Sequence, residues 1–353
     1  IIVLSFHGYH TKISTVLSVV LTYSCGCAIL VYISLNPTNM LWRESQEMEL
    51  YCMQALKERI QKLKKERDAV ILAHFYVDGS VQEIADYVGD SYYLSKKASE
   101  SPCKTILFCG VEFMGESAKI LNPEKTVIMA DVEADCPMAH MVTPDDIKKV
   151  REAYDDLSVV CYINSTAQTK AYSDVCVTSS NAERIVKALE QKNIFFIPDG
   201  NLGRNLAAKI PEKNFIFHTG YCCVHQDIMA YHVQDAMKEY PDAKVLVHPE
   251  CSPDVVALAD YAGSTSGILE YATKSDAQEF IICTETGIFY NLQKANPDKK
   301  FYAVKKHQVC DDMKKITLEK VELALKQGVP MELDENLMKK AEGALKQMHQ
   351  IAQ

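Results

Sequence analysis

Three cysteines of this chain recur at a nearly constant spacing. The chain has 353 residues and 13 cysteines, and no two of them form a CxxC pair. Cys136, Cys222 and Cys310 are 86 and 88 residues apart, so three similar segments would each supply one thiolate. Thiolates are soft ligands that favour zinc, copper(I) or an iron–sulfur cluster. A [4Fe–4S] cluster with three protein ligands would keep one iron open as a Lewis acid for a bound hydroxyl or carboxylate, which is the chemistry of a dehydratase or a lyase.

The remaining cysteines have simpler interpretations. Cys223 and Cys251 adjoin candidate site residues and are alternative ligands. Cys222, which follows Tyr162 by 60 residues where the other two segments have 62, is the predicted ligand. Four others lie in or near apolar runs and are predicted to be buried thiols: Cys109, Cys161, Cys176 and Cys283. An odd number of scattered cysteines does not match the disulfide framework of a small secreted domain. It indicates a reducing compartment, and we predict a cytoplasmic protein.

Polar residues follow three apolar, β-branched runs at the same period as the cysteines. The runs end at His74, Tyr162 and His248, which are 88 and 86 residues apart. A second polar residue lies two positions beyond each of these anchors: Tyr76, Asn164 and Glu250. Glu250 is the only carboxylate of the set, so it is the predicted general acid–base, and Tyr76 is the predicted second proton donor.

Hydroxyl residues form a further periodic set at predicted helix starts. Ser91, Ser179 and Ser264 are 88 and 85 residues apart, and Thr265 follows the last of them. Helix N-capping is the simplest role for such residues. Helix N-termini also bind phosphate and carboxylate groups, so the three together are candidates for holding a polyanionic substrate.

The elements that must position these residues also repeat. Pro-acid-Lys turns begin at Pro123, Pro211 and Pro297, 88 and 86 residues apart. Each unit is predicted as strand, helix, helix, strand, helix, strand, which is typical of a parallel sheet covered on both faces. We therefore predict three similar three-layer αβα units, related by pseudo-threefold symmetry around a central site at the carboxyl ends of their strands. The predicted units span residues 48–140, 141–226 and 227–312, and residues 313–353 are predicted to form helices that pack on the core.

The N-terminal segment and the overall charge limit the class of protein. No charged residue occurs between Ile13 and Trp42, and residues 13–35 are apolar and long enough to span a bilayer. The favoured interpretation is that residues 1–47 are a doubtful leader from upstream translation; a membrane anchor is the alternative, and no membrane association is expected. The net charge of -9 makes a nucleic-acid-binding protein improbable.

These motifs together resemble the quinolinate synthases, enzymes of the de novo route to NAD and hence of pyridine nucleotide biosynthesis. The resemblance runs from about Met48 to the C-terminus. It rests on motifs that occur in order: His74-Phe75-Tyr76, Gly89-Asp90-Ser91, Cys136-Pro137-Met138-Ala139, Tyr162-Ile163-Asn164-Ser165, Pro198-Asp199-Gly200-Asn201-Leu202-Gly203, Gly220-Tyr221-Cys222-Cys223-Val224-His225, His248-Pro249-Glu250-Cys251, Gly263-Ser264-Thr265 and Cys310-Asp311-Asp312-Met313-Lys314.

The resemblance implies a cofactor, a reaction and partners. One [4Fe–4S] cluster per chain would be held by Cys136, Cys222 and Cys310. Iminoaspartate would condense with dihydroxyacetone phosphate to give quinolinate, phosphate and water, in a transferase- or lyase-type reaction, and an aspartate oxidase or dehydrogenase would supply the iminoaspartate. The implied catalytic residues are Tyr76, His248 and Glu250, and His225 would lie near the cluster. The implied substrate contacts are His74, Ser91, Tyr162, Asn164, Ser179, His248, Glu250, Ser264 and Thr265.

Two other classes of protein fit parts of the pattern. One is a different three-cysteine iron–sulfur enzyme of pseudo-threefold build, such as a reductase of isoprenoid diphosphates or a diphthamide-type synthase. The other is a structural protein stapled by zinc, although a staple needs no acid–base groups at the strand ends.

Overall fold

The computed structural model describes residues 3–5, 18–24, 27–30 and 40–352, which divide into two units at Lys62 and Leu63. The first unit contains the antiparallel strands β1 (Val3–Ser5), β2 (Ser18–Ser24) and β3 (Cys27–Leu30) and most of helix α1 (Met40–Glu66). The alternative membrane anchor at 13–35 falls partly outside the described residues, and its described parts are β2 and β3. Among the residues described, no helix has the length and apolar character that crossing a membrane requires.

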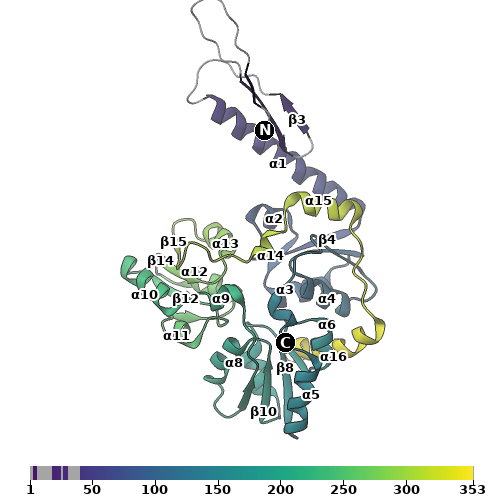
Figure 1. Ribbon diagram of the computed structural model, residues 1–353, viewed down its shortest axis with the longest axis vertical. Helices are drawn as coiled ribbons and strands as arrows, with labels where there is room; N and C mark the ends of the chain where they lie inside the picture. Colours follow the sequence, from purple (N-terminus) through teal and green to yellow (C-terminus); the bar gives the residue numbers. More distant parts are fainter. Residues whose placement is uncertain (1–2, 6–17, 25–26, 31–39, 353) are drawn as a thin grey trace, which may run out of the picture. The chain divides into compact units, whose positions relative to one another are not determined.

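The second unit is built from three four-stranded sheets, and every strand pair in them is parallel (Figure 1). In spatial order the sheets are β5 (Tyr87–Gly89), β4 (Ala69–His74), β6 (Thr105–Cys109) and β7 (Thr126–Met129); β9 (Val175–Val177), β8 (Leu157–Tyr162), β10 (Asn193–Ile197) and β11 (Asn214–Phe217); and β13 (Tyr261–Ala262), β12 (Lys244–Val247), β14 (Glu279–Cys283) and β15 (Lys300–Ala303). The central strands are almost wholly buried, as their continuous apolar runs require when both faces of a sheet are covered. The predicted fold class of three αβα units is confirmed.

Helices join the strands in the same order in each unit. They are α2 (Gly79–Ile84), α3 (Ser91–Glu100) and α4 (Glu112–Leu121); α6 (Ala167–Ala171), α7 (Ala182–Ala188) and α8 (Gly200–Ala207); and α11 (Pro253–Val256), α12 (Thr265–Lys274) and α13 (Ile288–Ala295). Shorter segments follow each sheet: the 3-10 helix η1 (Pro137–His140) with α5 (Pro144–Ala153), then α9 (Cys223–Gln226) with α10 (Ala230–Glu239), and finally α14 (Asp311–Lys314). The chain ends with α15 (Leu318–Gln327) and α16 (Glu335–Ile351).

The predicted order of elements was wrong at one position in every unit. A short edge strand, β5, β9 or β13, lies between the first two helices of each unit. An aspartate directly before each edge strand connects that strand to the first strand of the sheet. Its backbone amide donates to the carbonyl of one residue in the first strand, and its carboxylate accepts from the amide of the same residue. In the third unit, the Val245 amide donates to Asp260 Oδ2 over 2.8 Å and the Asp260 amide donates to the Val245 carbonyl over 2.9 Å. The other pairs are Asp86 with Ile71 and Asp174 with Val159.

The recurring Pro-acid-Lys turns also have a structural role. Lys125, Lys213 and Lys299 each directly precede the fourth strand of a sheet. Each lysine donates to two backbone carbonyls at the C-terminal end of the unit's second helix, α3, α7 or α12. Cations stabilise the negative end of a helix, where carbonyls lack partners. The turns therefore recur because they fasten helix to sheet at the amino ends of the strands.

The C-terminal helices pack on the first two units. Helix α15 contacts α2 and β6, and α16 contacts α4, α6, α7 and β9. Figure 1 shows α16, in yellow, beside α6. The segment between β15 and α15, residues 304–317, leads from the third unit back to the first and carries Cys310.

Candidate active site

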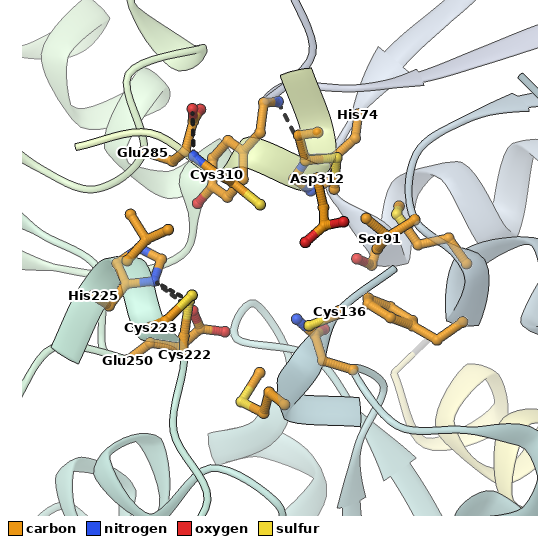
Figure 2. Close-up of a pocket in the computed structure, with 18 of the residues that line it drawn as sticks. His74, Ser91, Cys136, Cys222, Cys223, His225, Glu250, Glu285, Cys310 and Asp312 are labelled. Atoms are coloured by element: carbon orange, nitrogen blue, oxygen red, sulfur yellow. Dashed lines mark hydrogen bonds and ion pairs between the residues drawn. The ribbon is translucent and has the colours of Figure 1, made fainter. Parts of the chain in front are cut away.

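A cavity of about 310 Å³ lies where the carboxyl ends of the three sheets meet. Its wall combines apolar side chains with polar side chains from all three units and from residues 309–313 (Figure 2). Twelve of the thirteen predicted site residues line it: His74, Tyr76, Ser91, Cys136, Tyr162, Asn164, Ser179, Cys222, His248, Glu250, Thr265 and Cys310. The exception is Ser264, which does not line this cavity.

The three periodic cysteines occupy equivalent places in the fold. Cys136, Cys222 and Cys310 are each the residue before a one-turn helix, η1, α9 or α14, respectively. Burial raises the pKa of all three thiols, that of Cys310 to about 11. The cysteines from Cys52 to Cys310 are all free. Figure 2 shows the labelled cysteines around an open centre, with Cys136 and Cys310 on different sides of it.

The spacing of these thiols bears on which metal group they suit. In the described part of the chain, two groups of candidate metal ligands have all their ligand atoms within 4.8 Å of one another. One is Cys222 with His225 and Glu250, and the other is Glu112 with Asp135 and His140. The three periodic cysteines do not form such a group among the described residues. One tetrahedral zinc ion binds sulfur at about 2.3 Å and would need the three sulfurs close together. Three thiols spread around one cavity therefore fit a polynuclear iron–sulfur group better than a single zinc ion.

A buried acid–base pair lies beside Cys222. His225 Nδ1 is 2.6 Å from Glu250 Oε2 and 3.2 Å from Cys222 Sγ. Burial alone would raise the pKa of Glu250, but His225 and His248 outweigh it and hold that pKa below its usual value. Glu250 is therefore an ionised carboxylate inside the cavity wall.

His74 and His248, which also line the cavity, are neutral. Burial lowers the pKa of His74 and of His248 to about 3. The His248 ring stacks on His225 with centroids 4.7 Å apart, and His248 Nε2 lies 3.2 Å from Ser179 Oγ. A neutral imidazole can donate one hydrogen bond and accept another, so both rings can bind a polar substrate without adding charge.

Two tyrosines complete the acid–base set. Burial, reinforced by the Glu250 charge, raises the pKa of Tyr76 and of Tyr162, so both stay protonated and can act as donors. The Tyr76 hydroxyl is 2.9 Å from Thr265 Oγ1 and 2.8 Å from Thr284 Oγ1. The Tyr162 hydroxyl interacts with the Glu250 carboxylate, which contributes to the rise in the Tyr162 pKa.

The simple capping role fits only one of the three periodic serines. Ser264 Oγ accepts from the Gly267 amide over 3.2 Å and caps α12. Helix α3 is instead capped by Asp90, and the N-cap position of α7 belongs to Asn181. Ser91 and Ser179 therefore need another explanation, and both side chains face the cavity.

Sequence reasoning missed a second polar layer around the site. Glu285 is fully buried; one carboxylate oxygen accepts from the Gly287 amide, and the other accepts from the Cys310 amide over 3.3 Å and from Lys314 Nζ over 3.2 Å. Lys314 also donates to the Tyr76 carbonyl over 2.6 Å. The sequence offers one signal for Glu285, its place two residues after the end of β14.

Comparisons with known proteins show which family this chain is similar to. The family model described as quinolinate synthetase A protein matches residues 58–350. The chain is 55% identical over 298 residues to a protein named quinolinate synthase from Fusobacterium nucleatum subsp. nucleatum, covering 84% of this chain and 99% of the relative. It is 49% identical over 297 residues to the quinolinate synthase of Caldicellulosiruptor bescii and 49% identical over 302 residues to that of Clostridioides difficile, covering 84% of this chain and 98% of each relative.

Three parallel-sheet units that enclose a shared cavity, with buried acid–base groups in its wall, define an α/β enzyme whose site is assembled from all three units. The chain belongs to the quinolinate synthetase A family. The family resemblance predicted from the sequence motifs is confirmed.

Proposed function

We propose that this enzyme is a quinolinate synthase that condenses iminoaspartate with dihydroxyacetone phosphate to form quinolinate, phosphate and water for NAD biosynthesis. The observation that carries the proposal is that one thiol from each unit, a buried carboxylate and two protonated tyrosines converge on one cavity. The names of the relatives support the same activity.

Cys136, Cys222 and Cys310 would hold one [4Fe–4S] cluster per chain. The donor set fits, because three sulfur ligands from separate units surround the cavity and are not close enough to form a single-ion site. When bound, a cluster with three protein ligands supplies an open iron that acts as a Lewis acid.

The chain's own residues have to move protons and hold charge. The condensation leaves no net oxidation or reduction, so proton transfer is what the protein side chains must supply. Glu250, held as a carboxylate, would remove the proton that enolisation and ring closure require, and Tyr76, held protonated, would return one to a departing oxygen.

Polar groups that line the cavity would bind the substrates. Asn164 Oδ1 is buried and has no hydrogen-bond partner among the described residues, although its neighbours line the cavity. Buried polar atoms are rarely left unpaired in folded proteins. With Ser91, Ser179 and Thr265 it would contact the carboxylate and phosphate groups, for which an acidic protein needs local donors.

Two further proposals concern the setting of the reaction. Iminoaspartate contains a reactive imine, so an aspartate oxidase or dehydrogenase would have to supply it. The free thiols among the described cysteines agree with a reducing compartment, and we propose a cytoplasmic location.

The test is anaerobic purification followed by metal analysis and a turnover assay. We expect about four irons and four sulfides per chain and formation of quinolinate from the two substrates without added reductant. Glu250→Gln should keep the iron and lose turnover, whereas Cys109→Ala, which changes a buried thiol outside the cavity, should alter neither. Zinc in place of iron would support the structural staple, and a requirement for reductant would support the reductase alternative.

A further inference from the structure

Two cysteines of the second unit are aligned on neighbouring strands. Cys161 in β8 and Cys176 in β9 are Cα partners in the parallel register of these strands, and both are free thiols that are 0% exposed. Aligned residues on neighbouring strands point to the same face of a sheet, and the strands lie about 4.8 Å apart. A disulfide spans Cα atoms that are about 4.4–6.8 Å apart. The two sulfur atoms can therefore be joined while β8 and β9 stay paired.

A buried lysine lies close to this pair of thiols. Lys170 in α6 is 0% exposed, and its ammonium group donates to the carbonyls of Ser165 and Phe113. Burial alone would raise the pKa of Cys161, but its contacts with Cys176 and Ser165 and the charge of Lys170 outweigh burial and lower that pKa. Burial raises the pKa of Cys176, and Cys161 raises it further. The pair thus combines a thiol that ionises readily with a thiol that keeps its proton, and the thiolate is the nucleophilic form of cysteine.

We propose that Cys161 and Cys176 form an oxidative modification site, at which hydrogen peroxide converts the two thiols into a disulfide between β8 and β9. The Cys161 sulfur attacks one peroxide oxygen and breaks the O–O bond, which gives a sulfenic acid and releases the other oxygen as water. The Cys176 sulfur then displaces the hydroxyl of the sulfenic acid, which leaves as a second water. Two electrons pass from the sulfurs to the peroxide, and the two thiol protons leave in the two waters. This chemistry goes beyond the proposed function and uses none of the residues assigned to it.

The fold itself does not require thiols at these two places. The same register joins the first strand to the edge strand in the other two units, where the equivalent pairs are Ala73 with Val88 and Val247 with Ala262. Small apolar side chains are therefore sufficient to pack this face of the sheet. The facing thiols are specific to the second unit.

The position of the pair connects it both to solvent and to the cavity. The C-terminal helix α16 contacts β9 and α6, so a local opening of α16 would admit a molecule as small as peroxide. Tyr162 directly follows Cys161, and Ser179 lies three residues after Cys176; both line the cavity. A covalent bond between β8 and β9 would therefore constrain the two strand ends that carry these side chains.

The test treats the anaerobic, cluster-containing protein with hydrogen peroxide, blocks the remaining thiols and maps the peptides by mass spectrometry. We expect a linked pair of peptides that contain Cys161 and Cys176 and that dithiothreitol separates. Cys109→Ala, which removes a buried thiol of the first unit, is the matched control and should leave this linkage unchanged. In Cys176→Ala, the sulfenic acid on Cys161 should be trapped by dimedone, whereas Cys161→Ala should give no dimedone adduct on Cys176.

Three results would overturn the proposal. The first is a protein without the linked peptides after peroxide treatment, the second is linkage that appears only when urea has unfolded the chain, and the third is a dimedone adduct on Cys176 rather than on Cys161. Activity per bound iron gives a separate readout: it should fall with the linked fraction in wild type, return with dithiothreitol, and stay constant in Cys161→Ala. Because the peptide map does not depend on turnover, a protein that forms the disulfide but makes no quinolinate would refute only the proposed function.

Discussion

Replacing Lys314 by methionine should destabilise the protein, because it removes the cation that pairs with the buried carboxylate of Glu285. Glu285 is 0% exposed, and Lys314, whose side chain is 24% exposed, is the cation 3.2 Å from its carboxylate. Burial raises the pKa of Glu285, and Lys314 is the largest influence that opposes this rise. Removing the lysine therefore leaves a buried charge with two backbone amides as its main partners.

The size of the effect follows from this geometry. Removing one partner of a buried ion pair typically costs about 3–5 kcal/mol. Water can reach part of Lys314, so we expect a loss near the lower end, about 3 kcal/mol, in the free energy of unfolding measured by urea titration of the anaerobic protein. Lys346→Met is the control, because Lys346 pairs with Glu342 on the exposed face of α16, where such pairs contribute about 0.3–0.5 kcal/mol.

A double-mutant cycle separates the stranded charge from other effects. Glu285→Gln keeps an oxygen that can accept from an amide but carries no charge, so Lys314→Met should cost only about 1 kcal/mol in that background, the value of an ordinary hydrogen bond. The coupling energy should therefore be about 2 kcal/mol. If the two substitutions are additive within about 0.5 kcal/mol, the reasoning about a buried, lysine-dependent carboxylate is wrong.

Three further predictions concern the cysteine ligands, the aspartate before β13 and one serine of the cavity. Cys222→Ala should lose the bound iron and its visible absorbance, and Cys223→Ala should retain both; the reverse result would exchange the two assignments. Burial raises the pKa of Asp260, but the Lys244 hydrogen bond and a backbone amide outweigh it and lower the pKa overall, so its stabilisation is present above the pKa of the unfolded chain and is lost as pH falls through the lower folded value. The difference in unfolding free energy between wild type and Asp260→Asn, about 2 kcal/mol at pH 7 for a charged hydrogen bond, should therefore shrink below about pH 4, and a constant difference would contradict it. Ser179→Ala should raise KM without changing the melting temperature, because Ser179 faces the cavity and caps no helix; a lower melting temperature with normal KM would show a structural role.

Much of the architecture was predictable because its physical causes are local and repeated. Anchors such as His74 and His248 stand directly at the ends of buried apolar strands, and parallel strands that end together bring their last residues to one edge. The cysteine spacing was informative for the same reason, since Cys136, Cys222 and Cys310 begin equivalent short helices.

What escaped prediction depends on contacts between distant segments. Thr284 and Tyr76 are separated by 208 residues, and Lys314 and Tyr76 by 238, so no local periodicity connects them. The edge strands such as β13 (Tyr261–Ala262) are too short to show alternation and exist because Asp260 ties them to the neighbouring strand. A sequence pattern also cannot show whether a serine caps its own helix, and the capping interpretation held for Ser264 alone among the three.

The aspartates before the edge strands and the lysines of the Pro-acid-Lys turns have a consequence for how this protein tolerates substitutions. Asp260 and Lys299 each stand just before a strand, at the amino edge of their sheet, and their counterparts in the other two units do the same. The cavity lies at the opposite, carboxyl edge. The residues that hold each sheet together therefore lie at its amino edge, and the residues that line the cavity lie at its carboxyl edge. Substitutions can accumulate at one edge while the other is preserved. The three units can then diverge in the side chains they present to the cavity, as His74, Tyr162 and His248 already differ, without any of them losing the aspartate and lysine contacts that they share.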